Sequence, residues 1–269
     1  MSVMLNPTPD NHALPVKLRP FIPLTGLNDH EFNVLVRTID SALIPVRGRP
    51  WSLSLSIRVL LVAVALRTNI TTRAIAVLFT TTQSTADRII RHLTPVIAKA
   101  LRPKPGHGDE GMWLIDGTLI PVHDQTRTAL SKNYRRSINT QIMTRYANRR
   151  VIAVGKTWPG NRNDIIVAKA TMADVVTQAP SVVLGDGAYQ SMPGITTPKR
   201  DSSGKIIRDE AWETHRKLRA SVEHVIARLK DWQILRQCRR KAKGIDQALQ
   251  AVAGIYNLRI DLRVKSGVK

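Results

Sequence analysis

The sequence predicts two structural classes in one chain: an all-α region, then an α/β domain with a mixed sheet flanked by helices. Three observations lead to this prediction. Apolar residues recur at helical spacing over residues 24–101. A run rich in proline, glycine and basic residues follows at 102–110, as expected for a linker between domains. At 111–265, short buried-strand runs alternate with helical patterns, which is typical of a sheet covered by helices.

The first 23 residues carry prolines at positions 7, 9, 15, 20 and 23. Such a proline-rich chain end favours extended and loosely ordered backbone, so we expect residues 1–23 to form a flexible arm. Four helical patterns follow, and most begin after a plausible capping residue. They cover about 27–43, 57–67, 73–79 and 83–93.

The last three predicted helices have the spacing of a helix-turn-helix motif. A helix and a short helix are followed by the turn at 80–82 and by a helix that opens QSTADRIIRH. In this motif the last helix enters the major groove of DNA, where its first residues reach the base edges. The candidate DNA contacts on it are Gln83, Ser84, Thr85, Arg88 and Arg91. The alternative is an ordinary helical bundle with exposed polar side chains.

The chain is strongly basic. Its 41 Lys and Arg residues against 20 Asp and Glu residues give a formal net charge of +21 and a pI near 11.0. A surplus of this size costs self-repulsion and usually indicates a polyanionic partner, nucleic acid above all. We therefore expect double-stranded DNA as the partner. The alternative is a generally basic protein whose charge only aids solubility.

Cysteine usage and hydropathy exclude several classes of protein. The single cysteine, Cys238, excludes an intramolecular disulfide and any multi-cysteine zinc site. The N-terminus lacks the pattern of a signal peptide. The longest apolar run, at 59–66, is far shorter than a bilayer span. We expect a soluble protein with no membrane partner, located in the cytoplasm and associated with the nucleoid.

Two apolar strand runs each lead into an aspartate followed by a glycine, in LIDGT and VLGDGAY. Functional residues of α/β sheets gather just past the ends of strands, so Asp116 and Asp186 are expected to meet there. Two like charges in one place are costly unless a cation neutralises them, and all-oxygen ligands suit Mg2+ or Mn2+. The alternative for each Asp-Gly pair is a simple turn.

A long amphipathic helix is predicted at 209–232, because apolar residues recur there at spacings of three and four. Arg219, Glu223 and Lys230 lie on one shoulder of its apolar stripe. Glu223 is placed to supply a third oxygen ligand, and Arg219 and Lys230 are placed to hold phosphates. Three carboxylates with two divalent ions suit in-line phosphoryl transfer. The alternative is a solvated helix face with an ion pair between Arg219 and Glu223.

Taken together, several segments resemble the DDE-superfamily transposases of bacterial insertion sequences and, more distantly, the harbinger-type transposases. The segments are WLIDGTLIPVHD (113–124), SKNYRRSINTQ (131–141), PGNRNDIIV (159–167), VLGDGAY (183–189) and RASVEHVIARLKDWQILR (219–236). The resemblance reaches from about residue 24 to residue 262 and includes the helix-turn-helix.

The resemblance implies a ribonuclease-H-like catalytic fold in which Asp116, Asp186 and Glu223 bind two Mg2+ ions, with Mn2+ as the alternative metal. It also implies DNA cleavage at the ends of the element and strand transfer into target DNA. Some relatives carry a tyrosine where this chain has Arg216, so the resemblance assigns no role to this position. Glu223 follows Asp186 by only 37 positions, too few for the large domain that some transposases insert there.

Several further polar residues need an interpretation. Basic residues outside the helix-turn-helix are candidate contacts to the DNA backbone, with solvated surface charge as the alternative. They are Lys132, Arg135, Arg136, Arg219, Lys230, Arg239 and Arg240. We expect His123 and Asp124 to be polar surface residues at a strand end, and Asp164 to cap a helix. A place beside the catalytic site is the alternative for these three.

The sequence thus predicts a transposase that binds terminal inverted repeats through its helix-turn-helix and cleaves DNA through a DDE triad, as a homodimer on DNA. Two other functions remain open. One is a domesticated, non-catalytic DNA-binding protein of the same descent. The other is a helix-turn-helix transcriptional regulator with an α/β ligand domain, which leaves the acidic triad unexplained.

Overall fold

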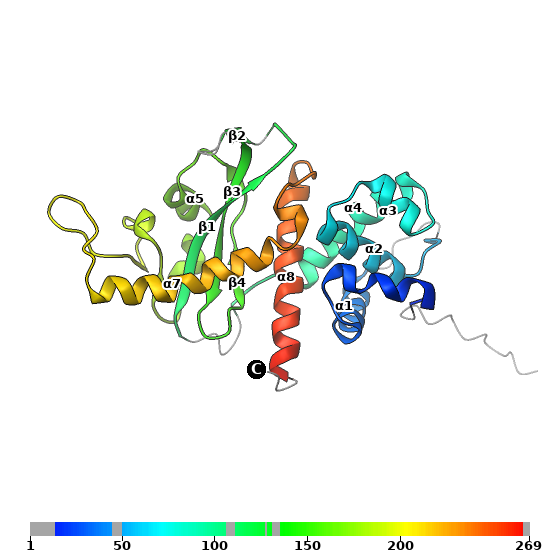
Figure 1. The fold of residues 1–269 in the computed structure, drawn as a ribbon, viewed down its shortest axis with the longest axis horizontal. Helices are drawn as coiled ribbons and strands as arrows, with labels where there is room; N and C mark the ends of the chain where they lie inside the picture. Colours follow the sequence, from blue (N-terminus) through cyan, green and yellow to red (C-terminus); the bar gives the residue numbers. More distant parts are fainter. Residues whose placement is uncertain (1–13, 45–49, 106–110, 127, 131–134, 266–269) are drawn as a thin grey trace, which may run out of the picture.

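The computed structural model describes residues 14–44, 50–105, 111–126, 128–130 and 135–265. The helical N-terminal region and the sheet lie side by side, and one long helix, α8 (Lys243–Lys265), stands between them (Figure 1). This arrangement confirms the predicted α/β class with helices flanking a mixed sheet. Within the described residues, no helix is long and apolar enough to cross a membrane.

Four α-helices make up most of the N-terminal region: α1 (Asp29–Ala42), α2 (Leu55–Thr68), α3 (Thr72–Leu78) and α4 (Gln83–Ala100). Each begins after a residue whose side chain accepts a hydrogen bond from a backbone N–H of the first turn. These residues are Asn28, Ser54, Thr71 and Thr82. Such caps satisfy donors that a helix start leaves free, so the sequence fixes where each helix begins. Four residues separate α3 from α4, as the helix-turn-helix prediction requires.

The prediction of a flexible arm at 1–23 is wrong for the part that the structure describes. Two short 3-10 helices, η1 (Val16–Phe21) and η2 (Pro23–Thr25), occupy this stretch. Leu18 and Ile22 are buried in the main core, and the Phe21 ring meets the edge of Phe79, with centroids 5.9 Å apart. The prolines restrict the backbone to turns, and the burial of the apolar residues between them holds the segment against the core. Residues 1–13 lie outside the described part.

The sheet is built around two long antiparallel strands, β1 (Trp113–Pro121) and β3 (Arg136–Arg145). On the far side of β1 lie β6 (Val183–Leu184) and β7 (Ile195–Thr196), both parallel to their neighbours. Three short strands pair with β3: β2 (Ala129–Leu130), β4 (Val151–Val154) and β5 (Trp158–Pro159). The strand β7 was not predicted, because its two residues lie in a long loop without a period-2 pattern.

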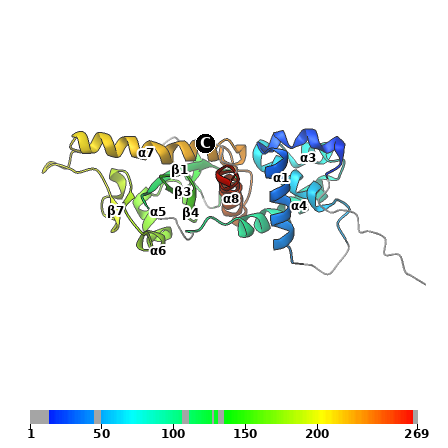
Figure 2. The ribbon, with the colours of Figure 1, turned by 90° about the horizontal axis from the view of Figure 1, so that it is seen from below.

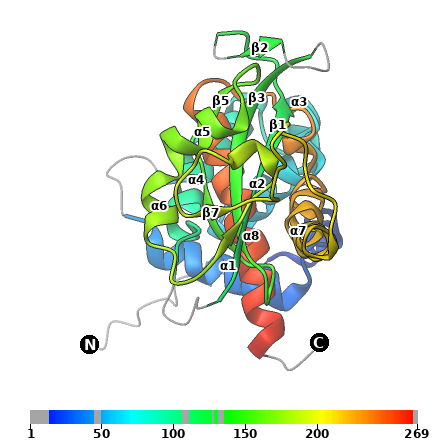
Figure 3. The same ribbon diagram turned by 90° about the vertical axis from the view of Figure 1, so that its left-hand side faces the viewer.

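Helices cover both faces of the sheet. The helix α7 (Glu210–Leu229) lies on one face, and α5 (Asp164–Thr171) and α6 (Ala173–Thr177) lie on the other (Figures 2 and 3). Side chains of a strand alternate between faces. Leu114 of β1 therefore joins the core beneath α7, whereas Trp113 and Ile115 join a second core beneath α5 and α6.

The helix α8 joins the two regions. It packs along α4, and Gly254 permits the closest approach, since a Cβ there would lie 2.5 Å from the Cβ of Leu101. On its other side, Asn257 exchanges two hydrogen bonds of 2.8 Å with the backbone of Val151. Buried residues of the N-terminal helices, α7 and α8 form one continuous core. The two regions are therefore held in a fixed relation by shared packing.

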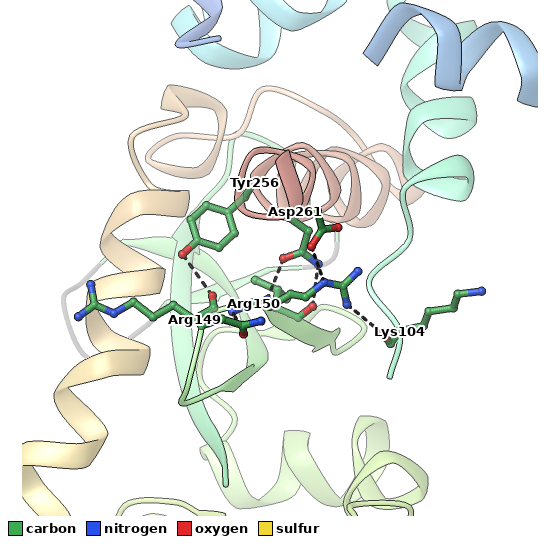
Figure 4. Close-up of polar contacts among 8 residues, drawn as sticks. Lys104, Arg149, Arg150, Tyr256 and Asp261 are labelled. Atoms are coloured by element: carbon green, nitrogen blue, oxygen red, sulfur yellow. Dashed lines mark hydrogen bonds and ion pairs between the residues drawn. The ribbon is translucent and has the colours of Figure 1, made fainter. Parts of the chain in front are cut away.

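Polar contacts around the turn between β3 and β4 reinforce this junction (Figure 4). The Tyr256 hydroxyl donates to the carbonyl of Arg149 at 3.2 Å. Arg150 pairs with Asp261 at 3.2 Å and also donates to the carbonyl of Lys104 at 3.4 Å. The segment predicted as a linker is thus tied to both α8 and the sheet where it leaves α4.

Candidate active site and DNA-binding face

Asp116 lies in the middle of β1, not at its end as the sequence suggested. The strand continues through Gly117 and Thr118 to Pro121 because β3 pairs with it over this whole length. Asp116 has the same parity as Leu114, so its side chain emerges on the face that α7 covers. It is thereby placed opposite the predicted glutamate helix.

Asp186 does follow a strand end. It comes two residues after β6 and begins the 3-10 helix η3 (Gly187–Tyr189), where its side chain accepts a hydrogen bond of 2.9 Å from the N–H of Ala188. The neighbouring Gly185 is bound from α7, because Nε2 of His215 donates to its carbonyl oxygen at 2.9 Å. His215 is buried and fixes α7 beside this turn. Sequence reasoning missed it.

Arg219 lies between two of the predicted metal ligands. Its Nη2 is 3.3 Å from Oδ1 of Asp116 and 4.0 Å from Oε1 of Glu223. Glu223 is open to solvent, with 60% of its side chain exposed, whereas the side chains of Asp116 and Arg219 are 19% and 16% exposed. The Nε of Arg219 is buried and has no hydrogen-bond partner. A buried donor without a partner is expected where a ligand with acceptor oxygens completes the site.

The three carboxylates influence one another electrostatically. Burial raises the pKa of Asp116 to about 6, Arg219 opposes this shift, and the charges of Asp186 and Glu223 add to it. A buried carboxyl group among like charges is the environment in which a cation binds favourably. In its donor chemistry the set therefore fits a divalent metal ion.

The set is not assembled as a metal centre in this structure. Within the described part of the chain, no group of three or more His, Cys, Asp or Glu residues is close enough to hold a metal ion. The guanidinium of Arg219 supplies the positive charge between Asp116 and Glu223 instead. The predicted metal ligands Asp116, Asp186 and Glu223 thus share one neighbourhood without converging on one point.

Asp164 lies on the opposite face of β1, and the prediction that it caps a helix is wrong. It is the first residue of α5, and neither it nor the N-cap Asn163 makes a side-chain cap hydrogen bond. Its Oδ1 accepts from Nδ2 of Asn139 at 2.8 Å and from Nε2 of Gln141 at 3.2 Å. The side chain of Asp164 bonds to β3 rather than to the backbone of its own helix, because β3 presents two amide groups where α5 begins.

Gly117 makes this contact between β1 and α5 feasible. A Cβ on Gly117 would lie 2.6 Å from Cγ of Asp164, well inside van der Waals contact. Behind it, the hydroxyl of the fully buried Tyr189 donates to Oε1 of Gln141. A polar network thus runs from Asp164 through Gln141 to η3, which also carries Asp186. The polar run Asn139-Thr140-Gln141 inside a long predicted strand was the sequence signal for it.

A basic groove lies beside the C-terminal end of α7. Its volume is about 870 Å³, and it is lined by residues of β1, the start of β3 and the segment after α7. Burial lowers the pKa of Lys230 in this groove. The cations that line it are Arg135, Arg228, Lys230 and Arg236. With one carboxylate, Asp231, against these four cations, the groove carries a net positive charge, as a surface for a DNA strand requires.

The predicted reading helix α4 presents most of its candidate contacts at the surface. Gln83 and Ser84 are exposed at its start, and Oε1 of Gln83 accepts a hydrogen bond of 3.2 Å from Arg73. Thr85 is partly buried, and both its backbone N–H and its hydroxyl are hydrogen-bonded to the hydroxyl of the capping Thr82. Arg88 stacks on Trp51, and Arg91 pairs with Asp87 at 2.6 Å.

The other candidate DNA contacts differ in exposure. Arg135, Arg136 and Arg239 are exposed, as a backbone contact requires. Arg240 is mostly buried and lies 3.7 Å from Asp87, so it connects the segment before α8 to the reading helix. Lys132 lies outside the described residues. These assignments stay predictions.

Three residues with open roles are now placed. Arg216 is exposed and stacks on Trp212, its guanidinium 5.3 Å from the ring centre. Asp124 is buried, contrary to the prediction that it is a polar residue at the surface. It accepts hydrogen bonds from Thr126 and, at 2.9 Å, from the N–H of Ala242, which lower its pKa to about 2. It fixes the segment that precedes α8, whereas His123 is exposed as expected.

Comparison with known proteins agrees with this architecture. Residues 108–258 match the family model of the transposase DDE domain, and residues 51–103 match the helix-turn-helix of DDE superfamily endonucleases. A protein of Streptomyces albus G, named "Putative transposase for insertion sequence element IS112", is 39% identical over 242 residues, which cover 88% of this chain and 93% of that protein. The chain belongs to the DDE-superfamily transposases of insertion sequences.

Proposed function

We propose that this transposase cleaves DNA at the ends of its element and transfers the strands into target DNA, with Asp116, Asp186 and Glu223 as ligands of divalent metal ions. One observation carries the proposal. Arg219 lies 3.3 Å from Asp116 on β1 and 4.0 Å from Glu223 on α7, and the charge of Asp186, just before η3, also raises the pKa of Asp116, so three acidic groups act on one place. Gathering like charges is unfavourable for the empty protein, and bound metal ions would compensate it at a site that also binds a phosphate.

Endonucleases of this superfamily generally use divalent metal ions. Two such ions, Mg2+ by our proposal, would activate water or a 3′-hydroxyl and stabilise the leaving oxygen. The chain's own contribution is to position the DNA. Arg219, with its unsatisfied buried Nε, would bind the scissile phosphate, and Lys230 would bind a neighbouring phosphate in the basic groove.

The helix-turn-helix would bind the terminal inverted repeats. Its reading helix α4 is joined through α8 to the domain that carries the triad, so recognition and cleavage occur at a fixed separation. Each copy of the chain has one reading helix and one triad, whereas an element has two ends. We therefore propose a homodimer on DNA, acting in the bacterial cytoplasm at the nucleoid.

The proposal is tested by Glu223→Gln, which keeps the size of the side chain and removes its charge. A duplex carrying the element's terminal repeat is incubated with Mg2+ or Mn2+, and cleavage is followed alongside a gel-shift with the same duplex. We expect cleavage to fall by a factor of at least about 100, as for loss of a group that stabilises the reacting charge, with binding unchanged.

Glu213→Gln is the matched control, because Glu213 is an exposed glutamate in the first turn of the same helix. It should cleave like the wild type. Full cleavage by Glu223→Gln would refute the assignment of Glu223. If the wild-type protein binds the repeat but never cleaves it with either metal, the chain is a DNA-binding protein without catalytic activity.

A further inference from the structure

We propose that Trp51, Arg58, Arg88 and His92 form a binding site for a backbone phosphate of DNA at one edge of α4. Arg88 would then hold the duplex in position rather than read its bases. The inference rests on the proposed function only in that α4 must meet DNA, and it assigns Trp51 and Arg58, which no earlier argument used.

Trp51 is the centre of the cluster. It lies ahead of α2, and the guanidinium carbons of Arg58 and Arg88 stand 5.2 Å and 4.9 Å from its ring centre. The ring of His92 is 5.6 Å from the same indole, at an interplanar angle of 35°. Two guanidinium groups and an imidazole from α2 and α4 are therefore gathered around one aromatic side chain.

The cluster is rich in cationic groups and lacks an acidic partner. Arg58 is only 8% exposed, and its Nε donates to the carbonyl of Leu53 at 3.1 Å. Within the described residues, no carboxylate forms an ion pair with Arg58 or Arg88. Burial lowers the pKa of Arg58 with no opposing charge. A buried cation without a counter-ion is costly unless an anion from outside completes the site.

At the opposite edge of α4, an arginine of the same helix does have an acidic partner. Arg91 is held by Asp87 at 2.6 Å, and Asp87 also lies 3.7 Å from Arg240. At about 100° per residue, Ser84, Arg88 and Arg91 share the exposed face of α4. One arginine of this face is thus neutralised within the protein, whereas Arg88 keeps its charge for a ligand.

The stacking geometry favours a phosphate over a base as this ligand. Stacking on Trp51 holds Arg88 beside this ring, and the guanidinium of Arg58 approaches the same ring. Planar guanidinium groups bind phosphate oxygens through paired hydrogen bonds, and stacking on an aromatic ring fixes their plane. Contacts of this kind set the register of a protein on DNA, while base contacts supply specificity. Ser84 and Gln83 remain in front to reach base edges.

The test measures the salt dependence of binding by the full-length protein, without divalent ions. Fluorescence anisotropy gives the affinity for a duplex of the terminal repeat and for a shuffled duplex of equal length, over a KCl series. Each phosphate contact contributes a slope of about −0.9 to the plot of log affinity against log salt. We expect Arg88→Ala to make the slope shallower by about 1 and to weaken both duplexes by the same factor.

Lys99→Ala is the matched control, because it also removes one exposed charge from α4, near the far end of the helix. It should leave the slope unchanged. Arg58→Lys retains the buried charge in case Arg58→Ala does not fold, and it should weaken both duplexes equally because the planar paired donors are lost.

Two results would overturn the phosphate site. One is an Arg88→Ala protein with the wild-type slope. The other is an Arg88→Ala protein that loses affinity only for the terminal repeat, because Arg88 would then read a base. If the wild-type protein binds both duplexes equally, recognition of the element ends by the proposed function fails instead, and the slope still decides the phosphate site.

Discussion

An aspartate lies on each face of β1, and the two carboxylates have opposite environments. On the α7 face, Asp116 is buried among like charges, and its pKa is raised to about 6. On the α5 face, Asp164 accepts hydrogen bonds from two amide side chains, 2.8 Å and 3.2 Å long. The carboxylate of Asp164 approaches β1 at Gly117, where the missing side chain leaves room for it.

This difference distinguishes a carboxylate with a functional role from one with a structural role. The protein leaves Asp116 poorly compensated, with one guanidinium and one backbone N–H against two neighbouring carboxylates. It gives Oδ1 of Asp164 two amide donors, and it links that residue to the buried Tyr189 through Gln141. Poorly compensated charge marks functional sites, whereas satisfied buried networks specify structure.

The largest effect is expected from Gly117→Ala, which places a methyl group between the two faces. The added Cβ would lie 2.6 Å from Cγ of Asp164 and 3.1 Å from Nε2 of Gln141. Overpacking of this kind costs about 3 kcal/mol when the neighbours are held in place. Unfolding in urea should show this loss of stability.

The same substitution has an internal control. In the double variant Gly117→Ala/Asp164→Ala, the clashing carboxylate is gone, so the two losses should not add. We expect the double variant to be less destabilised than the sum of the two single variants by at least about 1 kcal/mol. Simple additivity would mean that Gly117 is not the point where the two faces meet.

The second prediction concerns the sign of an Asp→Asn change on each face. Asp116 has a folded-state pKa of about 6 against an ordinary value of 3.8, so the folded state binds its proton more tightly than the unfolded state. Ionisation of Asp116 therefore costs stability as the pH rises from about 4 to about 6, and the full cost persists above that window. Asp116→Asn should stabilise the metal-free protein at pH 8 by about 2 kcal/mol. This is below the roughly 3 kcal/mol of the shift, which already includes the ion pair with Arg219, because an amide replaces the neutral carboxyl group imperfectly.

The matched change on the other face, Asp164→Asn, should have the opposite sign. An asparagine can place its carbonyl oxygen at the position of Oδ1, but a neutral oxygen accepts from the amide groups of Asn139 and Gln141 more weakly than a carboxylate does, so the variant should lose about 1–2 kcal/mol at pH 8. Unfolding in urea with a chelator present, at pH 4.5 and pH 8, measures both variants. A stabilising Asp164→Asn or a destabilising Asp116→Asn at pH 8 would reverse the comparison.

The sequence was most informative where a local rule acts. Capping residues predicted the starts of α1 and α2 to within one or two residues, at Asn28 or Asp29 and at Ser54 or Ser56, and Asn28 and Ser54 are the caps. The apolar stripe of α7 predicted that Glu223 lies beside the core with Arg219, and Arg219 lies between Glu223 and Asp116. The sequence failed where a distant partner decides. Pairing with β3 continues β1 beyond Asp116. The side chain of Asp164 bonds to amide groups of β3 instead of capping α5, and apolar side chains within residues 14–23 are buried in the core. The position of Arg219 between two carboxylates also depends on the approach of α7, which no spacing within one segment encodes.

The smallest effect is expected from Tyr189→Phe, which removes one hydroxyl from the network on the α5 face. The Oε1 of Gln141 then loses its donor inside a core where Tyr189 is fully buried. An unsatisfied buried acceptor costs about 1–2 kcal/mol. Because burial raises the pKa of Tyr189 far above its usual range, the loss should be the same at pH 4.5 and pH 8, unlike the effect of Asp116→Asn. Tyr146→Phe, at an exposed tyrosine next to β3, is the control and should leave the free energy of unfolding unchanged. Equal stability of the two phenylalanine variants would show that the network contributes nothing, and the contrast between the faces would then rest on Asp164 alone.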